Sequence, residues 1–246
     1  MGKSKIPYID WVLNNITGCT AMSDGCANCY AKVMYERFDK SGLPFSDVRI
    51  DMNLFGKRLL EIKDKKQMVV GVNFMADTFH KDVTKKQIDD MLVMLNTVSQ
   101  HQYIIFTKRY DRLVKYINEI DVPANVHFGI SICNGNDLIK FHRIVINTPI
   151  KSKLIISFEP LIEKLGVDTN YPLTHTIREY CKWAIVGAES LGNKGGREYN
   201  EEWASQIKIL CDKYYVPFYH KQQFIEGKKS HLLYGNEYLD NPLESK

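Results

Sequence analysis

The sequence lacks the long apolar runs that mark membrane-spanning and secreted proteins. No stretch approaches ~18 consecutive apolar residues, and the start, MGKSKIPYIDWVL, has no apolar core of a signal peptide. Gly/Ser-rich linkers, low-complexity tracts and internal repeats are missing too. We therefore expect a cytoplasmic protein with no membrane partner.

The sequence lacks a large excess of either sign of charge. Its 33 Lys and Arg residues against 29 Asp and Glu residues give a formal net charge of +4. This balance permits a phosphate-bearing partner without requiring one. The apolar fraction of 44% is that of an ordinary globular protein. A chain of 246 residues can bury one sizeable core, so we predict a single domain over 1–246, with 226–246 as a C-terminal extension.

Short β-branched or aromatic runs alternate with helical patterns, which is typical of βαβ units. Strands are expected at 11–17, 68–74, 103–107, 126–132, 153–158, 183–186 and 216–219, and helices at 28–40, 53–64, 84–100, 109–119, 134–147 and 201–214. Thr84 followed by Gln87 predicts a capping box at the start of the third helix. The predicted fold class is α/β, a partial (β/α) parallel barrel of about six to seven strands.

A polar cluster follows each expected strand. In chain order these are NITGC, NFMADTFH, TKR, SICN, SFEP, GAES and YHKQ. The carboxyl ends of the strands in a parallel barrel form the rim on which active sites are built. We therefore expect a functional rim, although each cluster alone is also compatible with a helix N-cap or a turn.

Three of the six cysteines lie in the segment GCTAMSDGCANCYA, 18–31, with the spacing C-x6-C-x2-C. In a reducing compartment such clusters more often bind metal or do redox chemistry than form disulfides. A structural zinc site uses four ligands in paired sets, so zinc would need a distant partner such as His80. Three thiolates suit a 4Fe-4S cluster with one iron left open. Zinc and three unligated buried thiols remain as alternatives.

The other cysteines fall at separate places. Cys133 ends the fourth expected strand and is a candidate fourth ligand, although a small core residue is the favoured interpretation. Cys181 precedes the sixth expected strand, and Cys211 lies among apolar neighbours in the last helix. We interpret both as structural.

The motifs GCTAMSDGCANCYA, NFMADTFH, FTKR, SFEPL, VGAES and VPFYHKQ, in this order, resemble an uncharacterised phage and bacterial family with a three-cysteine motif. That family is itself similar to radical S-adenosylmethionine enzymes. The resemblance covers about 11–222. It implies a radical-SAM-like partial barrel with a 4Fe-4S cluster on Cys19, Cys26 and Cys29, and S-adenosylmethionine on the open iron. It also implies an external one-electron donor and, for a phage protein, the host-cell cytoplasm.

Two departures from the radical-enzyme pattern affect the cofactor site. The usual spacing is C-x3-C-x2-C with an aromatic residue before the last cysteine, where this chain has Asn28. The GGE triad that receives the amino group of S-adenosylmethionine is absent, and Asn73 and Asp77 stand after the second strand instead. The cofactor-binding candidates are Asn73, Asp77, Ser131, Asn134, Glu159 and Glu189.

Four residues are the catalytic candidates. Glu159 and Glu189 each follow an apolar strand segment, so their carboxylates are placed to meet an ammonium group, a ribose hydroxyl or a substrate proton. His80 could move protons near neutral pH, and Lys108 follows the third strand. The alternatives are a buried salt bridge for each glutamate and a structural role for the histidine.

Basic residues on the same rim suggest a nucleic-acid partner, DNA or RNA. Lys108, Arg109, Arg197 and Lys221 could together contact a phosphate backbone, although such residues are often only solvated. The leading hypothesis is an enzyme that generates a 5′-deoxyadenosyl radical and modifies or repairs nucleic acid. The alternatives are a non-catalytic nucleic-acid-binding protein stapled by zinc or an iron–sulfur cluster, and a partner protein that needs a second subunit. Metal content distinguishes the enzyme from the non-catalytic nucleic-acid-binding protein.

Overall fold

The computed structural model describes residues 2–166, 171–192 and 194–244. Among these residues, eight strands belong to the main sheet, which is mostly parallel, and helices alternate with them, so the predicted α/β class is confirmed. The chain forms two compact units. Unit 1 comprises Met1–Ala21, Ala31–Gly129 and Leu243–Lys246, and unit 2 comprises Met22–Tyr30 and Ile130–Pro242. The single domain over 1–246 stays a prediction, and residues 245–246 of the expected extension lie outside the described residues.

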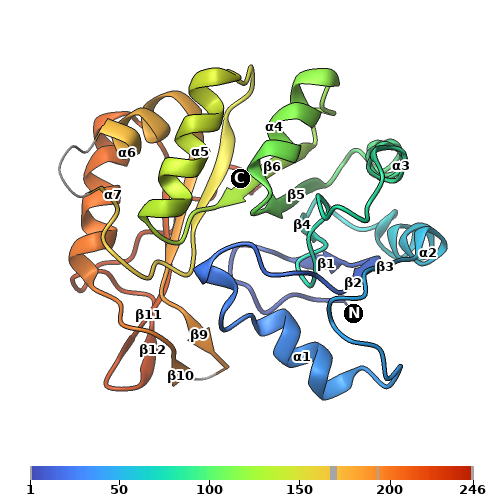
Figure 1. Cartoon of the computed structure of the whole chain (residues 1–246), viewed down its shortest axis with the longest axis horizontal. Coiled ribbons are helices and arrows are strands. Elements are labelled where there is room, and N and C mark those ends of the chain that lie inside the picture. Colours follow the sequence, from blue (N-terminus) through green and yellow to red (C-terminus); the bar gives the residue numbers. More distant parts are fainter. Residues whose placement is uncertain (1, 167–170, 193, 245–246) are drawn as a thin grey trace. The chain divides into compact units, whose positions relative to one another are not determined.

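Unit 1 is built on parallel strands. Strand β1 (Trp11–Leu13) pairs with β4 (Val69–Val72), which pairs with β5 (Gln102–Thr107), and β6 (Val126–Ser131) comes next in the order. All four residues of β4 are buried, as expected for a strand covered on both faces. Helices α2 (Met52–Ile62) and α3 (Lys85–Asn96) lie side by side in Figure 1, and α1 (Tyr30–Phe38) and α4 (Tyr110–Glu119) complete the unit.

The start of α3 follows from its sequence. The Thr84 hydroxyl accepts a hydrogen bond from the Gln87 backbone N–H at 3.2 Å, and the Gln87 side chain accepts one from the Thr84 N–H at 2.9 Å. These reciprocal bonds satisfy two helix-terminal N–H groups. The predicted capping box is therefore confirmed.

The expected strand 11–17 is two strands, which corrects that prediction. After β1, the short β2 (Ile16–Thr17) pairs antiparallel with β3 (Arg49–Ile50) in a separate ladder. The reason lies in Asn73, whose side-chain oxygen accepts hydrogen bonds from Asn15 N at 2.9 Å and Ile16 N at 3.3 Å. These bonds occupy backbone groups that a continuous β1 would have offered to β4.

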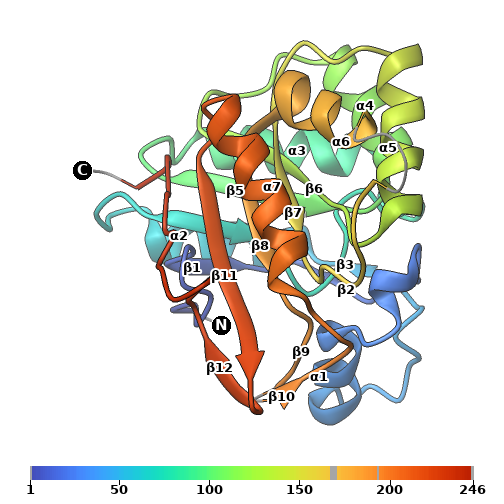
Figure 2. The same ribbon diagram turned by 90° about the vertical axis from the view of Figure 1, so that its left-hand side faces the viewer.

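Unit 2 carries β7 (Leu154–Phe158), β8 (Cys181–Gly187), β11 (Phe218–Ile225) and β12 (Lys228–Ser230). The first three are parallel neighbours in this order, and β12 is antiparallel to β11. Helices α5 (Gly135–Asn147) and α7 (Glu201–Lys213) belong to this unit, and Figure 2 shows α7 beside the long β11. A two-strand ladder joins β9 (Ser190–Leu191) to β10 (Lys194–Gly195).

Two features of unit 2 differ from the sequence expectation. A short helix α6 (Tyr171–His175) and a π-helical turn (Thr176–Tyr180) precede β8, where no helix was predicted. Strand β11 runs to Ile225, so the polar cluster YHKQ lies within a strand rather than after one. The chain after β12 returns to β11, since the His220 backbone N–H donates to the Tyr238 carbonyl at 2.7 Å.

Candidate functional site

In unit 1, the carboxyl ends of β4 and β5 bring Asp77 and Arg109 together. Arg109 Nη1 donates to Asp77 Oδ2 at 2.8 Å, and the two side chains are 7% and 9% exposed. Three further groups donate to the same carboxylate: Phe79 N at 2.8 Å, the Thr107 hydroxyl at 2.8 Å and Lys108 N at 3.3 Å. The buried charge of Asp77 is thus paired and hydrogen-bonded, which is how proteins tolerate such a charge.

The Arg109 guanidinium also reaches the first part of the cysteine segment. Nη2 donates to the Thr20 carbonyl at 3.1 Å and to the Thr20 hydroxyl at 3.0 Å, and Nη1 lies 3.8 Å from Cys19 Sγ. Arg109, a predicted phosphate contact, thus lies on Asp77 and on this segment, and its contact with phosphate stays a prediction. Sequence reasoning missed Thr20, because its partner lies 89 positions away.

His80 belongs to the same network. Its Nε2 lies 2.8 Å from the Thr20 hydroxyl, and the side chain is fully buried. Burial and the neighbouring Arg109 charge lower the pKa of His80, so the imidazole is neutral at pH 7. A neutral histidine can accept or donate a proton through Thr20, and the same bond holds Thr20 in place; a catalytic role for His80 stays a prediction.

Asn73 is the third candidate at the end of β4. Its backbone is in the left-handed region, with φ of 57°, which asparagine tolerates better than most residues. The side-chain oxygen is bonded to the backbone of 15–16, and the amide NH2 donates to the Thr78 hydroxyl at 3.1 Å. This amide therefore joins β4 to β2.

In unit 2, Glu189 follows β8 and lies against Arg197. The Glu189 carboxylate accepts hydrogen bonds from Arg197 Nη2, from Arg197 Nε at 3.0 Å and from Arg197 N at 3.0 Å. Although burial opposes ionisation, these bonds and the one from Asn28 lower the pKa of Glu189. The carboxylate is 4% exposed, whereas the guanidinium is 32% exposed.

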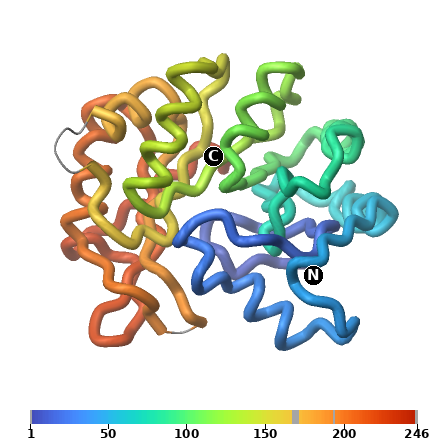
Figure 3. The backbone as a smooth tube through the Cα atoms, viewed as in Figure 1, coloured from blue at the N-terminus to red at the C-terminus, as the bar shows by residue number. Residues whose placement is uncertain are grey.

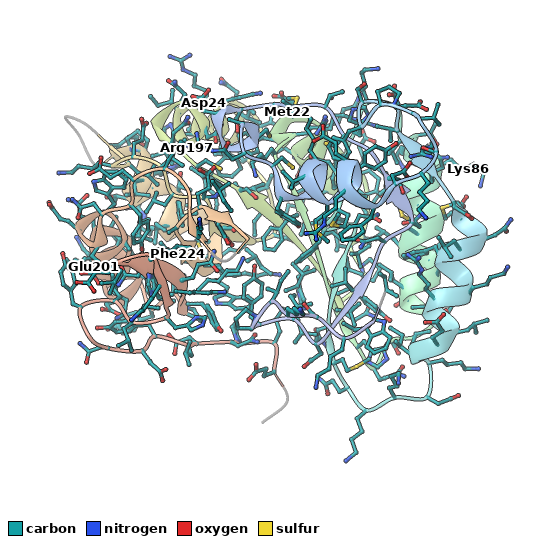
Figure 4. All side chains as sticks on the ribbon, turned by 90° about the horizontal axis from the view of Figure 1, so that it is seen from below. Met22, Asp24, Lys86, Arg197, Glu201 and Phe224 are labelled. Atoms are coloured by element: carbon teal, nitrogen blue, oxygen red, sulfur yellow. The ribbon has the colours of Figure 1, made fainter. Side chains whose placement is uncertain are left out.

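This pair holds the second part of the cysteine segment. Asn28 Nδ2 donates to Glu189 Oε2 at 2.9 Å, Arg197 Nη1 donates to the Asp24 carbonyl at 3.0 Å, and Asn134 Nδ2 donates to Asp24 Oδ2 at 3.0 Å. Figure 4 shows Arg197 and Asp24 as near neighbours. Asn28, which stands where radical enzymes have an aromatic residue, is thus the amide that binds Glu189.

Gly196 leaves the space that this arrangement needs. A Cβ built at this position would lie 2.3 Å from Glu189 Oε2, closer than atoms approach without a bond between them. The Gly196 N–H also donates to the Glu189 carbonyl at 3.0 Å. Any side chain at 196 would therefore displace the carboxylate.

The remaining rim candidates of unit 2 surround Glu159. Lys221 Nζ donates to Glu159 Oε1, and these side chains are 15% and 18% exposed. Cys133 is buried, with its Sγ 3.6 Å from the Glu159 carbonyl. Asn134 caps α5 through the Asp137 N–H at 2.8 Å, and Ser131 is a buried residue at the end of β6.

Three of the four predicted phosphate contacts form ion pairs within the chain. Arg109 pairs with Asp77, Arg197 with Glu189 and Lys221 with Glu159. The fourth, Lys108, is half-buried, and its backbone N–H bonds to Asp77. The ion pairs match the salt-bridge alternative for both glutamates.

The six cysteines fall into two groups by exposure. Cys19, Cys26 and Cys29 are partly exposed, whereas Cys133, Cys181 and Cys211 are buried. Burial raises the pKa of Cys181 to about 12 and raises that of Cys211 further, which makes both thiols inert. Cys19, Cys26 and Cys29 supply three thiol groups on one segment, and cysteine thiolates are the ligands that iron–sulfur clusters use. Within the described residues, no three His, Cys, Asp or Glu side chains are gathered closely enough to hold a metal ion.

A family model described as "Protein of unknown function (DUF5131)" matches residues 3–237. The chain belongs to this family. No curated protein matches this chain.

Solved structures similar to this chain include variants of spore photoproduct lyase. One single-substitution variant has 12% sequence identity and a TM-score of 0.54, covering 88% of this chain and 77% of that one. Another, with bound AdoMet and dinucleoside spore photoproduct, has 12% identity and a TM-score of 0.52, covering 93% and 70%. At this identity the likeness shows the fold, which is the radical-SAM-like partial β/α barrel expected from the sequence.

Within its described residues, the DUF5131 protein has no helix that is both long and apolar enough to cross a membrane.

Proposed function

We propose that this protein is a radical S-adenosylmethionine-type enzyme in which Cys19, Cys26 and Cys29 hold a 4Fe-4S cluster. The observation that carries the proposal is that hydrogen bonds from buried polar side chains hold the cysteine segment in place. Arg109 fixes residues 19–20, and Glu189 with Arg197 fixes Asp24 and Asn28. Buried polar networks of this kind support ligand loops in metal sites, where the groups behind the ligands set their positions.

The bound cluster would supply one electron to the sulfonium of S-adenosylmethionine. The chain's own residues supply position and exclusion of water. Arg109 donates toward Cys19 Sγ, and hydrogen bonds to ligand sulfurs are among the features that set the reduction potential of a cluster. Because this guanidinium is anchored on Asp77, its direction is fixed.

The two glutamates take different roles in this proposal. Glu189 is buried and its carboxylate is occupied by Arg197 and Asn28, so it is a positioning residue for the segment around Cys26 and Cys29. Glu159 is more accessible, at 18% of its side chain, and its carboxylate accepts a hydrogen bond from Lys221 Nζ. We assign Glu159 to the amino group of S-adenosylmethionine, which is a charge-assisted contact.

Nucleic acid, DNA or RNA, is the proposed substrate class. The supporting observation is the similar structure with bound dinucleoside spore photoproduct, which has a TM-score of 0.52 to this chain. The reaction also needs an external one-electron donor, and a second protein subunit is a compatible partner. Within this proposal the enzyme modifies or repairs a base or sugar carbon that polar chemistry cannot reach.

Cleavage of S-adenosylmethionine tests the proposal. Anaerobically reconstituted protein with a strong reductant should release 5′-deoxyadenosine and methionine even without substrate. Glu159→Gln should weaken S-adenosylmethionine binding about 10- to 150-fold, the equivalent of ~1.5–3 kcal/mol for a hydrogen bond to a charged group, with iron content unchanged. Glu189→Gln should instead lower iron content, because it disturbs the cysteine segment.

The reverse pattern would exchange the roles of the two glutamates. Stoichiometric zinc without sulfide would overturn the enzyme assignment and favour the non-catalytic, metal-stapled protein. No binding and no cleavage by fully reconstituted protein with any reductant would do the same.

A further inference from the structure

We propose that His142 and His175, in unit 2, form a binding site for a divalent transition metal of the zinc class. His142 lies on α5, and His175 is the last residue of α6. The two helices contact each other, and Figure 3 shows them side by side at its upper left. Neither histidine follows the end of a strand, so this site is separate from the cysteine segment and does not rest on the proposed function.

The two imidazole rings have the spacing of two ligands of one metal ion. Their centroids lie 5.1 Å apart, at an interplanar angle of 80°. With a Zn–N length of about 2.0–2.1 Å, each ring centre lies ~3.2 Å from the metal, and at the tetrahedral angle two ring centres are ~5.2 Å apart. An edge-to-face contact between two rings can have the same spacing, so the ring nitrogens decide between a metal site and simple packing.

Each ring carries a buried nitrogen without a hydrogen-bond partner among the described residues. These atoms are His142 Nε2 and His175 Nδ1. His142 is only 8% exposed, so bulk water does not supply the missing partner. Buried polar atoms are nearly always paired, and a bound ion is one of the groups that account for an exception. Because the lone pair of an imidazole nitrogen is a ligand for zinc, copper and nickel, two such nitrogens on touching rings point to a shared metal ion.

The surroundings of the pair suit a cation. Burial and the neighbouring His175 lower the pKa of His142, so its imidazole is neutral at pH 7, which is the form that binds a metal. Tyr171 stacks on His175 with the ring centroids 5.5 Å apart, and Tyr180 meets His175 edge-on at 5.5 Å. The faces of aromatic rings attract cations, and an apolar shell around metal ligands limits the access of water.

The chain directly after His175 adds two further observations. A π-helical turn, Thr176–Tyr180, begins there, and such turns are rare and frequent at functional sites. The Thr176 hydroxyl is buried and has no partner within the described chain, and a metal-bound water is a suitable partner for a hydroxyl. The cation two residues further along, Arg178, is paired with Glu179. Two imidazoles are thus the protein ligands, and water completes the coordination.

A metal at this place joins α5 to the segment that leads into β8. A ligand that binds the folded chain alone stabilises it in proportion to the logarithm of its free concentration above Kd. Zinc should therefore raise the melting temperature, and the rise should depend on both histidines.

The test is a titration with zinc chloride of the full chain carrying Cys19→Ala, Cys26→Ala and Cys29→Ala, because accessible thiols also bind zinc. Calorimetry should show one bound zinc per chain, and the imidazole resonances of His142 and His175 should shift together in NMR spectra. The same two resonances should shift in the cluster-free chain with its cysteines intact, which keeps the test valid if the triple variant does not fold.

Loss of a group behind a ligand already weakens metal binding about 10- to 100-fold, so His142→Asn and His175→Asn should each weaken zinc binding at least about tenfold. His175 is half-buried, so its replacement is informative even if His142→Asn unfolds. The matched control is His127→Asn, which removes a histidine bonded to Gln102 and should leave zinc affinity unchanged. Retained binding in His175→Asn, an equal loss in His127→Asn, or no zinc binding by the triple-cysteine variant in its folded state would overturn the site.

Discussion

Each unit contains one arginine–carboxylate pair that touches the cysteine segment, and the two pairs differ in burial. Asp77 and Arg109 are both under 10% exposed, whereas Arg197 is 32% exposed beside a buried Glu189. Arg109 contacts residues 19–20, and the Glu189–Arg197 pair contacts Asp24 and Asn28. When a fully buried ion pair loses one partner, the other partner remains in the interior as an unpaired charge. A half-exposed arginine that is removed can instead be replaced by water. We therefore expect the first pair to be essential for stability and the second to act mainly on loop position.

Asp77→Asn should cause the largest loss. It leaves the Arg109 guanidinium buried without its counter-ion, so the free energy of unfolding should fall by about 3–5 kcal/mol. Urea denaturation of the cluster-free protein measures this. The comparison variant in the second pair is Arg197→Gln, which removes the half-exposed partner, and equal losses in the two variants would contradict the difference between the pairs.

Gly196→Ala sharpens the comparison without removing a charge. The added Cβ meets Glu189 Oε2 at 2.3 Å, so the carboxylate must shift away from Arg197 and Asn28. Overpacking of this kind costs about 1–3 kcal/mol, and iron uptake should fall as well. Gly192→Ala is the control, because its Cβ meets nothing within 4 Å although its φ is 72°. If Gly192→Ala lowered iron uptake as much as Gly196→Ala, the steric account of Glu189 would be wrong.

Arg197→Gln should cost less, about 1–2 kcal/mol, since water can reach its place and Glu189 keeps the bonds from Asn28 and from the 197 backbone N–H. Its larger effect should be on the segment. Limited proteolysis near 24–28 should become faster in this variant than in wild type. Unchanged proteolysis together with unchanged iron uptake would show that the segment does not rely on Arg197.

The smallest expected effect concerns pH. Burial lowers the pKa of His220, which bonds to the Tyr199 hydroxyl at 2.9 Å. A histidine with a folded pKa below its unfolded value of ~6.5 stabilises the fold above that value, and this stability is lost as pH falls through the folded pKa. The melting temperature of wild type should thus fall between pH 7.5 and 5.5, and His220→Asn should show a smaller fall. An equal fall in His220→Asn and in wild type would show that His220 does not carry this pH dependence.

Local signals in the sequence were sufficient for much of the fold. The Thr84 and Gln87 capping box, the β4 and β5 runs and the helix at 201–213 follow from patterns within a few residues. Failures came from distant contacts. Strand 11–17 breaks because of Asn73, 58 positions from Asn15. The helix at 171–175 was missed because YPLTH offers no apolar repeat.

The candidate site shows the same division. Alternation of strands and helices predicted that Asp77, Arg109, Glu159 and Glu189 follow strand ends, and parallel pairing explains why ends meet within each unit. Their partners could not be predicted, because a single sequence gives no pairing between residues 32 or 161 positions apart, as in Asp77–Arg109 and Asn28–Glu189. The sequence therefore did not reveal that Arg109, Arg197 and Lys221 form ion pairs within the chain, and their contact with phosphate stays a prediction.

Iron and sulfide analysis of anaerobically purified or reconstituted protein tests the central claim most directly. The account predicts about four irons and four sulfides per chain, their loss in Cys19→Ala, Cys26→Ala and Cys29→Ala, and their retention in Cys211→Ala, whose thiol is buried. Retention in Cys133→Ala would leave the fourth iron open for S-adenosylmethionine. Loss of the cluster in Cys133→Ala, or zinc in place of iron and sulfide, would contradict an open-site cluster on the three partly exposed cysteines.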